Sequence, residues 1–137
     1  MSSPPTACEI EIRVRYAECD PMGYLHHSKY FEYFEMGRTE LLRKAGVRYR
    51  DLEERGVLFV VAKIGCKFRR PGRYDDLLRL HVEIARQTRA RIDHVYRLYR
   101  DETLLCEAES TLACVNREGQ IIPIPDELCP PELLDPA

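Results

Sequence analysis

Residues 18–35 read ECDPMGYLHHSKYFEYFE, and this stretch decides the architecture that we expect. Its first part, Asp20–Gly23, favours a turn, because Asp and Gly suit tight turns and Pro restricts the residue before it. Its second part opens a run of helical spacing, Ser28–Ala45, in which apolar side chains recur every three or four residues. The sequence therefore predicts a turn followed directly by a helix about 27 Å long.

Three small residues define the predicted helix. Ser28 is a candidate N-cap, because a serine hydroxyl can accept a hydrogen bond from a first-turn N–H. Gly46 stands where a glycine commonly closes the last turn. Gly37 lies inside the helix at a cost of about 1 kcal/mol, which indicates that the helix lies close to a flat surface such as a sheet.

The pattern of residues in the rest of the chain predicts β-strands. Residues 9–16 alternate apolar and charged side chains, which predicts a half-buried strand before the turn. Four more strands are expected after the helix: Val57–Phe68, Leu78–Ile84, Ile92–Tyr99 and Leu104–Val115. The first of these begins almost entirely apolar, which predicts a central strand covered on both faces. One helix and one antiparallel sheet make a two-layer α+β domain.

The chain is expected to form one domain over residues 1–137, because 137 residues suit a single core and no internal repeat or linker interrupts them. We place the ordered core at about residues 9–126. Five of the nine prolines fall in Ile121–Ala137, which predicts a loose tail over residues 121–137.

Composition excludes several classes of protein. The chain carries 21 Lys and Arg against 23 Asp and Glu, a formal charge of -2, so it lacks the positive field of a typical nucleic-acid-binding protein. The longest apolar run, Val57–Ala62, is far shorter than the roughly 20 residues of a membrane span. Residues 1–7 show no secretory signal pattern, so a cytoplasmic location is expected.

The cysteine pattern agrees with that location. Six cysteines are present without a C-x-x-C pair, and only four histidines accompany them. Cys106 and Cys114 are eight residues apart, so within one strand they point to the same face, as small buried apolar residues do. The thiols are expected to be reduced, with no metal site.

The densest group of polar residues joins the first strand to the helix, from Tyr16 to Tyr30. One reading is a loop that only caps the helix. The other uses the same geometry for chemistry: free N–H groups at a helix start can hold a carbonyl oxygen that gathers negative charge. A carboxylate just upstream can then attack that carbonyl or deprotonate a water. The residues alone leave both readings open.

The run from Arg13 to Glu40 also carries the spacing Asp-x-x-Gly…His-x-x-Tyr, followed by an aromatic-rich helix segment ending in Arg-Thr-Glu. This pattern resembles the opening of the hydroxybenzoyl-CoA thioesterase family of hot-dog proteins. The resemblance covers about residues 9–126. It implies a hot-dog fold, in which one long helix is wrapped by a five-stranded antiparallel sheet.

The resemblance implies roles for four residues. Asp20 matches the catalytic carboxylate, acting as nucleophile or as general base on water. Gly23 matches the glycine that lets substrate approach the loop, and His27 matches the residue whose backbone N–H polarises the thioester carbonyl. Tyr30 matches the aromatic residue one turn into the helix. Two departures, His26 and Met22, stand where the family usually has an aromatic or apolar residue and a small residue, and leave the shape of the acyl pocket open.

Other candidates compete with this assignment. Glu32 and Glu35 lie on the helix, where another branch of hot-dog thioesterases places its carboxylate, although acids near a helix start are commonly surface charges. Cys19 neighbours Asp20, but strand alternation is expected to turn it to the opposite face. His81 and His94 lie on predicted strands without a clustered partner, which indicates surface or packing roles.

Basic residues concentrate in two segments, Lys63–Arg73 and Arg86–Arg91. One reading is solvated strand edges that discourage aggregation. The resemblance favours the other, a pocket mouth that holds the phosphates of coenzyme A. The residues expected to do so are Lys63, Lys67, Arg69, Arg70, Arg89 and Arg91.

The expected function is therefore hydrolysis of an acyl-CoA thioester to a free acid and CoA, with no cofactor beyond the coenzyme A of the substrate. The resemblance implies a homodimer or homotetramer with sites between subunits. Two alternatives stay open: a hot-dog dehydratase or hydratase that pairs a histidine with a helix carboxylate, and a non-catalytic acyl-CoA-binding module.

Overall fold

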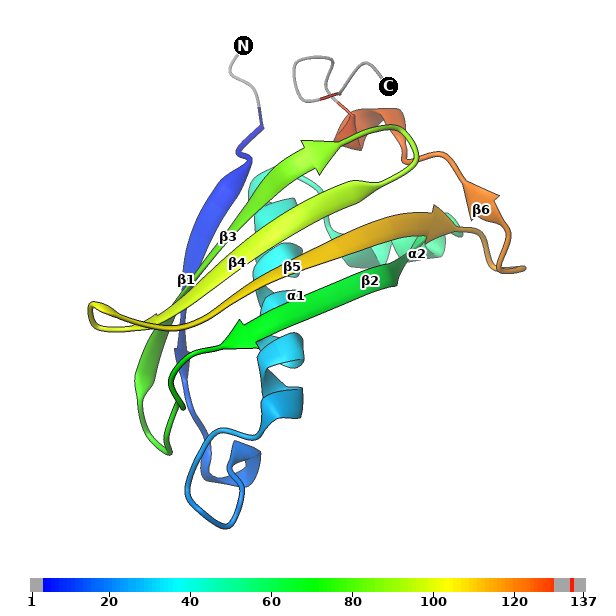
Figure 1. Cartoon of the computed structure of the whole chain (residues 1–137). Helices are drawn as coiled ribbons and strands as arrows, with labels where there is room; N and C mark the ends of the chain where they lie inside the picture. The colour runs from blue at the N-terminus through cyan, green and yellow to red at the C-terminus, as the bar shows by residue number, and fades with distance from the viewer. Residues whose placement is uncertain (1–3, 130–133, 135–137) are drawn as a thin grey trace.

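The computed structural model describes residues 4–129 and 134. A long helix, α1, lies against one antiparallel sheet, and a short second helix follows it (Figure 1). The helices are α1 His27–Lys44 and α2 Tyr49–Glu54, and the strands are β1 Ala7–Arg13, β2 Leu58–Phe68, β3 Leu77–Gln87, β4 Ile92–Arg100, β5 Thr103–Val115 and β6 Ile121–Ile122. The strand order is β1-β3-β4-β5-β2, with β6 added beside β5. The predicted α+β architecture is confirmed.

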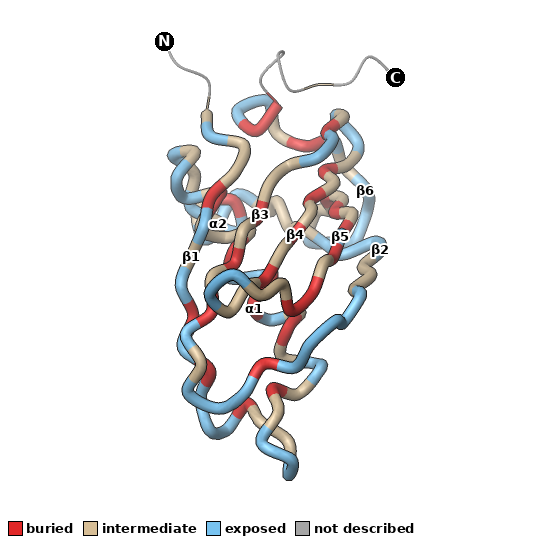
Figure 2. Tube along the Cα trace, turned by 60° about the vertical axis from the view of Figure 1, so that its left-hand side comes forward, coloured by how far each residue is buried: buried red, intermediate tan, exposed pale blue. Residues whose placement is uncertain are grey.

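The core lies between α1 and the inner face of the sheet. Figure 2 shows buried segments concentrated on β3, β4 and β5, where the strands pass α1. Tyr33 and Phe34 of α1 are almost wholly buried, and Phe34 stacks on Tyr96 of β4 with ring centroids 4.5 Å apart. A Cβ on Gly37 would come within 2.8 Å of the Leu80 side chain, so the close approach of the helix to the sheet that this glycine predicted is confirmed.

The two ends of α1 differ in how well the sequence predicted them. Gly46 has a φ of +90° and follows the last helical residues, as predicted. The predicted N-cap is wrong, because the helix begins one residue earlier and His26 caps it. The His26 ring accepts a hydrogen bond from the Ser28 N–H, so an imidazole replaces the expected hydroxyl and Ser28 lies inside the first turn.

β2 is an edge strand, not the central strand that its apolar start predicted. It pairs only with β5, and its side chains are largely half-buried or exposed. Val60, Val61 and Phe68 expose 40%, 48% and 50% of their surface. A run of apolar residues therefore misled the prediction here, because the strand is apolar without being covered within this chain.

A second buried cluster forms at the far end of the sheet, where α2 meets the chain after β6. Leu52 of α2 packs there with Ile124 and Leu128, which expose 1% and 8% of their surface. The predicted loose tail is wrong for residues 121–129, since they form β6 and a 3-10 turn, Asp126–Leu128, around these apolar side chains. Of the rest of that tail, only Leu134 lies within the described residues, and it packs against the same cluster.

All six cysteines are free thiols. Cys106 and Cys114 are both buried, on the same face of β5 as Ala108 and Leu112, as predicted from their spacing. No helix in the described part of the chain is both long and apolar enough to cross a membrane.

Candidate active site

The turn before α1 is closed by its own backbone. The Asp20 N–H donates to the Tyr24 carbonyl at 2.8 Å, and the Gly23 N–H donates to the Asp20 carbonyl at 2.9 Å. Gly23 has a φ of +82°, a conformation that favours glycine. Because the turn reverses the chain within four residues, Asp20 lies at the base of a narrow loop that leads into the helix.

The Asp20 carboxylate is oriented by two backbone groups. Its Oδ1 accepts hydrogen bonds from the Met22 N–H at 2.9 Å and from the Tyr24 N–H at 3.1 Å. The second oxygen, Oδ2, has no hydrogen-bond partner among the residues that the structure describes. The side chain is half-buried, so one oxygen is fixed while the other is left for a substrate or a water.

The first turn of α1 leaves one donor unused. The Ser28 N–H is bonded to the His26 ring, and the Lys29 N–H donates to the His26 carbonyl at 2.9 Å. The His27 N–H has no acceptor within the described part of the chain, and His27 itself is exposed. This N–H lies at the positive end of the helix dipole and is available to an oxygen that gathers charge.

A buried pair fixes the loop to the helix from behind. Glu18 exposes 7% of its surface and accepts hydrogen bonds from the Tyr33 hydroxyl at 2.7 Å and from the Arg15 N–H at 2.8 Å. Burial raises the pKa of Glu18, but these hydrogen bonds and the Arg15 charge outweigh it and hold the pKa below its ordinary value. Since the Glu18 carbonyl also accepts from the His26 N–H at 2.9 Å, the pair sets where the loop meets the helix.

Tyr30 lies below the loop, in the core. It exposes 3% of its surface, and its hydroxyl accepts a hydrogen bond from the Gly72 N–H at 3.1 Å. The Gly72 carbonyl in turn accepts from the Leu25 N–H at 2.8 Å. The structure thus places Asp20 and Gly23 in one turn and His27, exposed, at the helix start that follows it. Tyr30 is buried and holds the connection between β2 and β3 against the loop.

A cavity of about 320 Å³ opens beside Asp20. It is lined by Tyr16, Cys19, Asp20, Pro21, Gly23 and Tyr74. Tyr16 and Tyr74 expose 78% and 53% of their surface and meet edge to face with ring centroids 5.4 Å apart. Sequence analysis missed this exposed aromatic pair, because Tyr74 is 58 positions away from Tyr16 and belongs to no motif.

Cys19, which strand alternation predicted to face away from Asp20, also lines this cavity, but its side chain packs against the main core and its thiol donates to the Arg15 carbonyl at 3.7 Å. Residues 16–18 form a 3-10 turn, which ends the strand alternation on which that prediction rested. Burial raises the pKa of the Cys19 thiol, and the negative charges of Asp20 and Glu18 raise it further. A thiol held protonated in this way is a poor nucleophile.

The predicted phosphate-binding residues fall into two separate groups. Arg69 and Arg70 follow β2, on the connection that packs against the Asp20 loop, whereas Arg89 and Arg91 lie at the turn between β3 and β4. By register, the first group is level with Cys106 of β5 and the second with Leu112, which is about 20 Å further along the strand. One CoA pyrophosphate cannot contact both groups of a single chain.

The ion pairs of these residues differ as well. Arg69 pairs with Glu107, Arg89 pairs with Asp126 at 2.7 Å, and Arg91 pairs with Asp93 at 3.3 Å. The other three, Lys63, Lys67 and Arg70, are exposed and form no ion pair with a described residue. Of these, Arg70 lies on the segment next to the Asp20 loop.

The competing candidates lie elsewhere. Glu32 is exposed and pairs with Lys29 at 3.0 Å, and Glu35 lies further along α1, at the rim of a different cavity. His81 lies on the outer face of the sheet near Glu9 and Glu83. His94 is buried, with 5% of its surface exposed. No three His, Cys, Asp or Glu side chains in residues 4–129 or at 134 are grouped so as to hold a metal ion.

Comparison with known proteins places this chain in a family. The family model described as "Thioesterase-like superfamily" matches residues 14–131. The chain belongs to that superfamily. It is 34% identical over 106 residues to the acyl-CoA thioester hydrolase YbgC of Escherichia coli O157:H7, covering 77% of this chain and 79% of that protein. It is 32% identical over 114 residues to the acyl-CoA thioesterase YbgC of Haemophilus influenzae, covering 82% and 83% of the two chains.

Solved structures agree. A crystal structure from Bartonella henselae described as a "Probable Thioesterase" superposes with a TM-score of 0.83 at 31% identity, covering 87% of this chain and 99% of that one. The hot-dog fold, the family resemblance and the prediction of a thioester hydrolase are therefore confirmed. The catalytic roles of individual residues and the acyl group stay predictions.

Proposed function

We propose that this protein hydrolyses an acyl-CoA thioester at the loop before α1, with Asp20 as general base or nucleophile and the His27 N–H as the oxyanion contact. The observation that carries the proposal is the pairing of a carboxylate with one free oxygen and a helix-start N–H with no acceptor in the described chain. Relatives named acyl-CoA thioester hydrolase and acyl-CoA thioesterase support the reaction class.

The proposed reaction follows from these two groups. The thioester carbonyl oxygen accepts from the His27 N–H, which polarises the carbonyl and stabilises the negative charge that develops on attack. The Asp20 Oδ2 either takes a proton from an attacking water or attacks the carbon itself, and water then hydrolyses the resulting anhydride. The C–S bond breaks, the CoA sulfur leaves and is protonated, and the acyl group is released as a carboxylic acid. Water, the carboxylate and the substrate suffice, with no separate cofactor.

The CoA phosphates are proposed to lie at the same end of the sheet as Asp20, near Arg70 and Lys67. These residues are exposed and unpaired with any described carboxylate, whereas Arg89 and Arg91 are already paired with Asp126 and Asp93. An unpaired cation gains more from a phosphate than one that must first give up a carboxylate. Arg89 and Arg91 would then contact phosphate only across a subunit interface.

We also propose that the protein is a homodimer formed through β2, or a homotetramer made of two such dimers. An edge strand leaves a row of backbone N–H and C=O groups unpaired, and β2 is eleven residues long with exposed Val60 and Val61. Pairing with β2 of a second copy would satisfy those groups and cover these side chains.

Sedimentation should show a dimer or larger, and a Val60→Lys/Val61→Lys double variant should be largely monomeric. Met36→Lys, at an equally exposed helix position, should not change the mass, and a monomeric wild type contradicts the proposal.

Release of free thiol from a panel of aromatic, branched and straight-chain acyl-CoAs tests the function. Wild type is expected to release thiol from at least one of them, and Asp20→Asn is expected to lower kcat roughly 10²–10⁴-fold. A dehydratase or hydratase would change the acyl chain without releasing thiol, and a binding module would show saturable binding with no turnover. Either result, or an Asp20→Asn variant as active as wild type, contradicts the proposal.

A further inference from the structure

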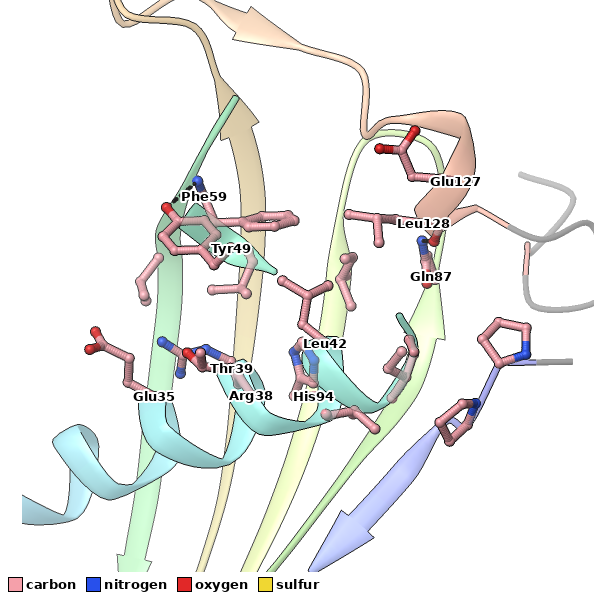
Figure 3. A pocket seen from close by; sticks show the side chains of 18 residues that line it. Glu35, Arg38, Thr39, Leu42, Tyr49, Phe59, Gln87, His94, Glu127 and Leu128 are labelled. Carbon is pink, nitrogen blue, oxygen red and sulfur yellow. Dashed lines mark hydrogen bonds between the residues drawn. The ribbon is translucent and has the colours of Figure 1, made fainter. Parts of the chain in front are cut away.

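A second cavity of about 250 Å³ lies at the other end of α1 from the Asp20 loop. It opens between the second half of α1, the α2 helix and the sheet strands β2, β3, β4 and β5 (Figure 3). Most of its lining is apolar, including Leu42, Tyr49, Phe59 and Leu112. Arg38, which lines the cavity, is eleven residues beyond His27 in the chain, or about 16 Å along the helix axis. The cavity is thus separate from the candidate active site.

His94 contributes an unpaired polar group to this apolar lining. Only 5% of its surface is exposed, and its Nδ1 is buried without a hydrogen-bond partner in the described structure. Burial, together with the nearby Arg38 charge, lowers the pKa of His94 to about 3, so the ring is neutral at physiological pH and carries one N–H donor. An unpaired buried polar atom costs free energy, and the tautomer with its proton on Nδ1 would recover that free energy from a bound acceptor.

Arg38 contributes a positive charge to the lining of this cavity. Its guanidinium donates to the Tyr96 hydroxyl at 3.1 Å, and that hydroxyl lies 2.6 Å from the Ser110 hydroxyl. Arg38 is half-buried and forms no ion pair with any carboxylate of the described residues. Glu35, one turn away, is exposed at the rim (Figure 3). A half-buried guanidinium with only a neutral partner favours an anion beside it.

We propose that this cavity binds a small monocarboxylic acid. The apolar body lies among Leu42, Tyr49, Phe59 and Leu112, and the carboxylate accepts hydrogen bonds from Arg38 and from the His94 ring. Figure 3 shows Arg38 and His94 beside α1, with Tyr49 and Phe59 across the cavity from them. A ligand with a second carboxylate is disfavoured, because that charge meets either the apolar wall or Glu35 at the rim. The proposal does not depend on the proposed function, although the acid that thioester hydrolysis releases belongs to the same class.

Calorimetric titration of the full chain with three six-carbon probes tests the ligand class. Hexanoate is expected to bind saturably, one per chain, and hexan-1-ol and adipate about tenfold or more weakly, since one lacks the charge and the other carries a second one. Saturating hexanoate should also shift the ring ¹⁵N resonances of His94 in wild type. If hexan-1-ol binds as tightly as hexanoate, or the His94 resonances do not move, the proposal is wrong.

Matched variants test the location. Arg38→Gln should weaken hexanoate binding about tenfold, the effect of one charge-assisted hydrogen bond. Arg43→Gln, also on α1 but paired with Glu40 outside the cavity, should leave binding unchanged. Asp20→Asn should bind hexanoate as wild type does. Loss of binding in Asp20→Asn, or equal binding by Arg38→Gln and Arg43→Gln, overturns the proposal. If Arg38→Gln does not fold, the His94 resonances of wild type decide.

Discussion

The two ends of α1 are built in opposite ways. At the start of the helix, the loop of residues 20–24 holds one carboxylate with its own backbone N–H groups, and the unused His27 N–H follows three residues later. At the far end, the cavity around Arg38 and His94 is assembled from α1, α2, the 3-10 turn after β6 and four strands. The first end is polar and exposed, and the second is mostly apolar and half-enclosed.

This difference explains how each end can work. Backbone donors fixed by a turn need no reorganisation when charge develops on a substrate oxygen, which suits a reaction. An apolar cavity with one cation and one neutral imidazole offers little to a reaction but holds an amphipathic ligand. On these proposals, one helix supports chemistry at its N-terminal end and ligand binding along its C-terminal half. Variants can separate the two.

Straining the turn should affect only the reactive end. Gly23→Val places a β-branched residue at a φ of +82°, which costs about 1–2 kcal/mol and shifts the donors that hold Asp20. We expect kcat to fall about 100-fold, since a shift of about 1 Å has that effect, while hexanoate binding is unchanged. Steady-state thiol release measures this.

Gly119→Val is the matched control for that variant. Gly119 has a φ of +79° and open space around it, as Gly23 does, but lies in the turn after β5. Gly119→Val should lower the free energy of unfolding by about as much as Gly23→Val does, and should keep the kcat of wild type. Equal losses of kcat in both variants would mean that the effect of Gly23→Val is general destabilisation.

The buried His94 of the second cavity should make the free energy of unfolding depend on pH. The pKa of His94 is about 3 in the folded chain and close to 6.5 when unfolded, so only the unfolded chain takes up this proton as the pH falls below 6.5. Between pH 6.5 and 5, its contribution to the free energy of unfolding should fall by up to about 1.4 kcal/mol per pH unit.

Denaturant melts at several pH values measure that slope. His94→Gln should flatten it, because glutamine does not titrate. His81→Gln, on the outer face of the sheet, should leave most of it in place. A wild-type slope that survives in His94→Gln would show that other groups carry the pH dependence.

Removing a CoA phosphate contact near the Asp20 loop should give the smallest effect of these variants. Arg70→Gln should raise KM for an acyl-CoA about 3–10-fold with little change in kcat, because a phosphate contact remote from the thioester binds substrate and transition state equally. Arg89→Gln, about 20 Å away along the sheet, is the comparison within one chain. If only Arg89→Gln raises KM, the phosphates lie at the other end or across the subunit interface.

The same contrast explains what the sequence could predict. The turn and α1 depend on neighbours within about twenty residues, so their patterns are visible in the chain, and both were predicted. Gly37 was informative although Leu80, the residue it faces, is 43 positions away, because a glycine inside a helix itself indicates a close approach. The N-cap was missed because an imidazole can replace a hydroxyl as acceptor. The place of β2 was misjudged because an apolar strand looks the same whether its own chain or a second copy covers it.

The far end of the molecule was the hardest to predict. His94 and Arg38 are 56 positions apart, and nothing in the spacing shows that β4 crosses α1 at Arg38. Likewise, α2 and the packed segment 121–129 are short and proline-rich or weakly periodic, so their buried cluster depends on contacts with the sheet. Only tertiary packing reveals such sites.

The most direct test of the account compares kcat for two carboxylate variants on the same acyl-CoA, one in the loop before α1 and one midway along the helix. Asp20→Asn should lower kcat roughly 10²–10⁴-fold, whereas Glu35→Gln should leave it nearly unchanged, with both variants folded by circular dichroism. The reverse order, a large loss in Glu35→Gln and near-normal turnover in Asp20→Asn, would contradict the account and move the chemistry to the helix carboxylate.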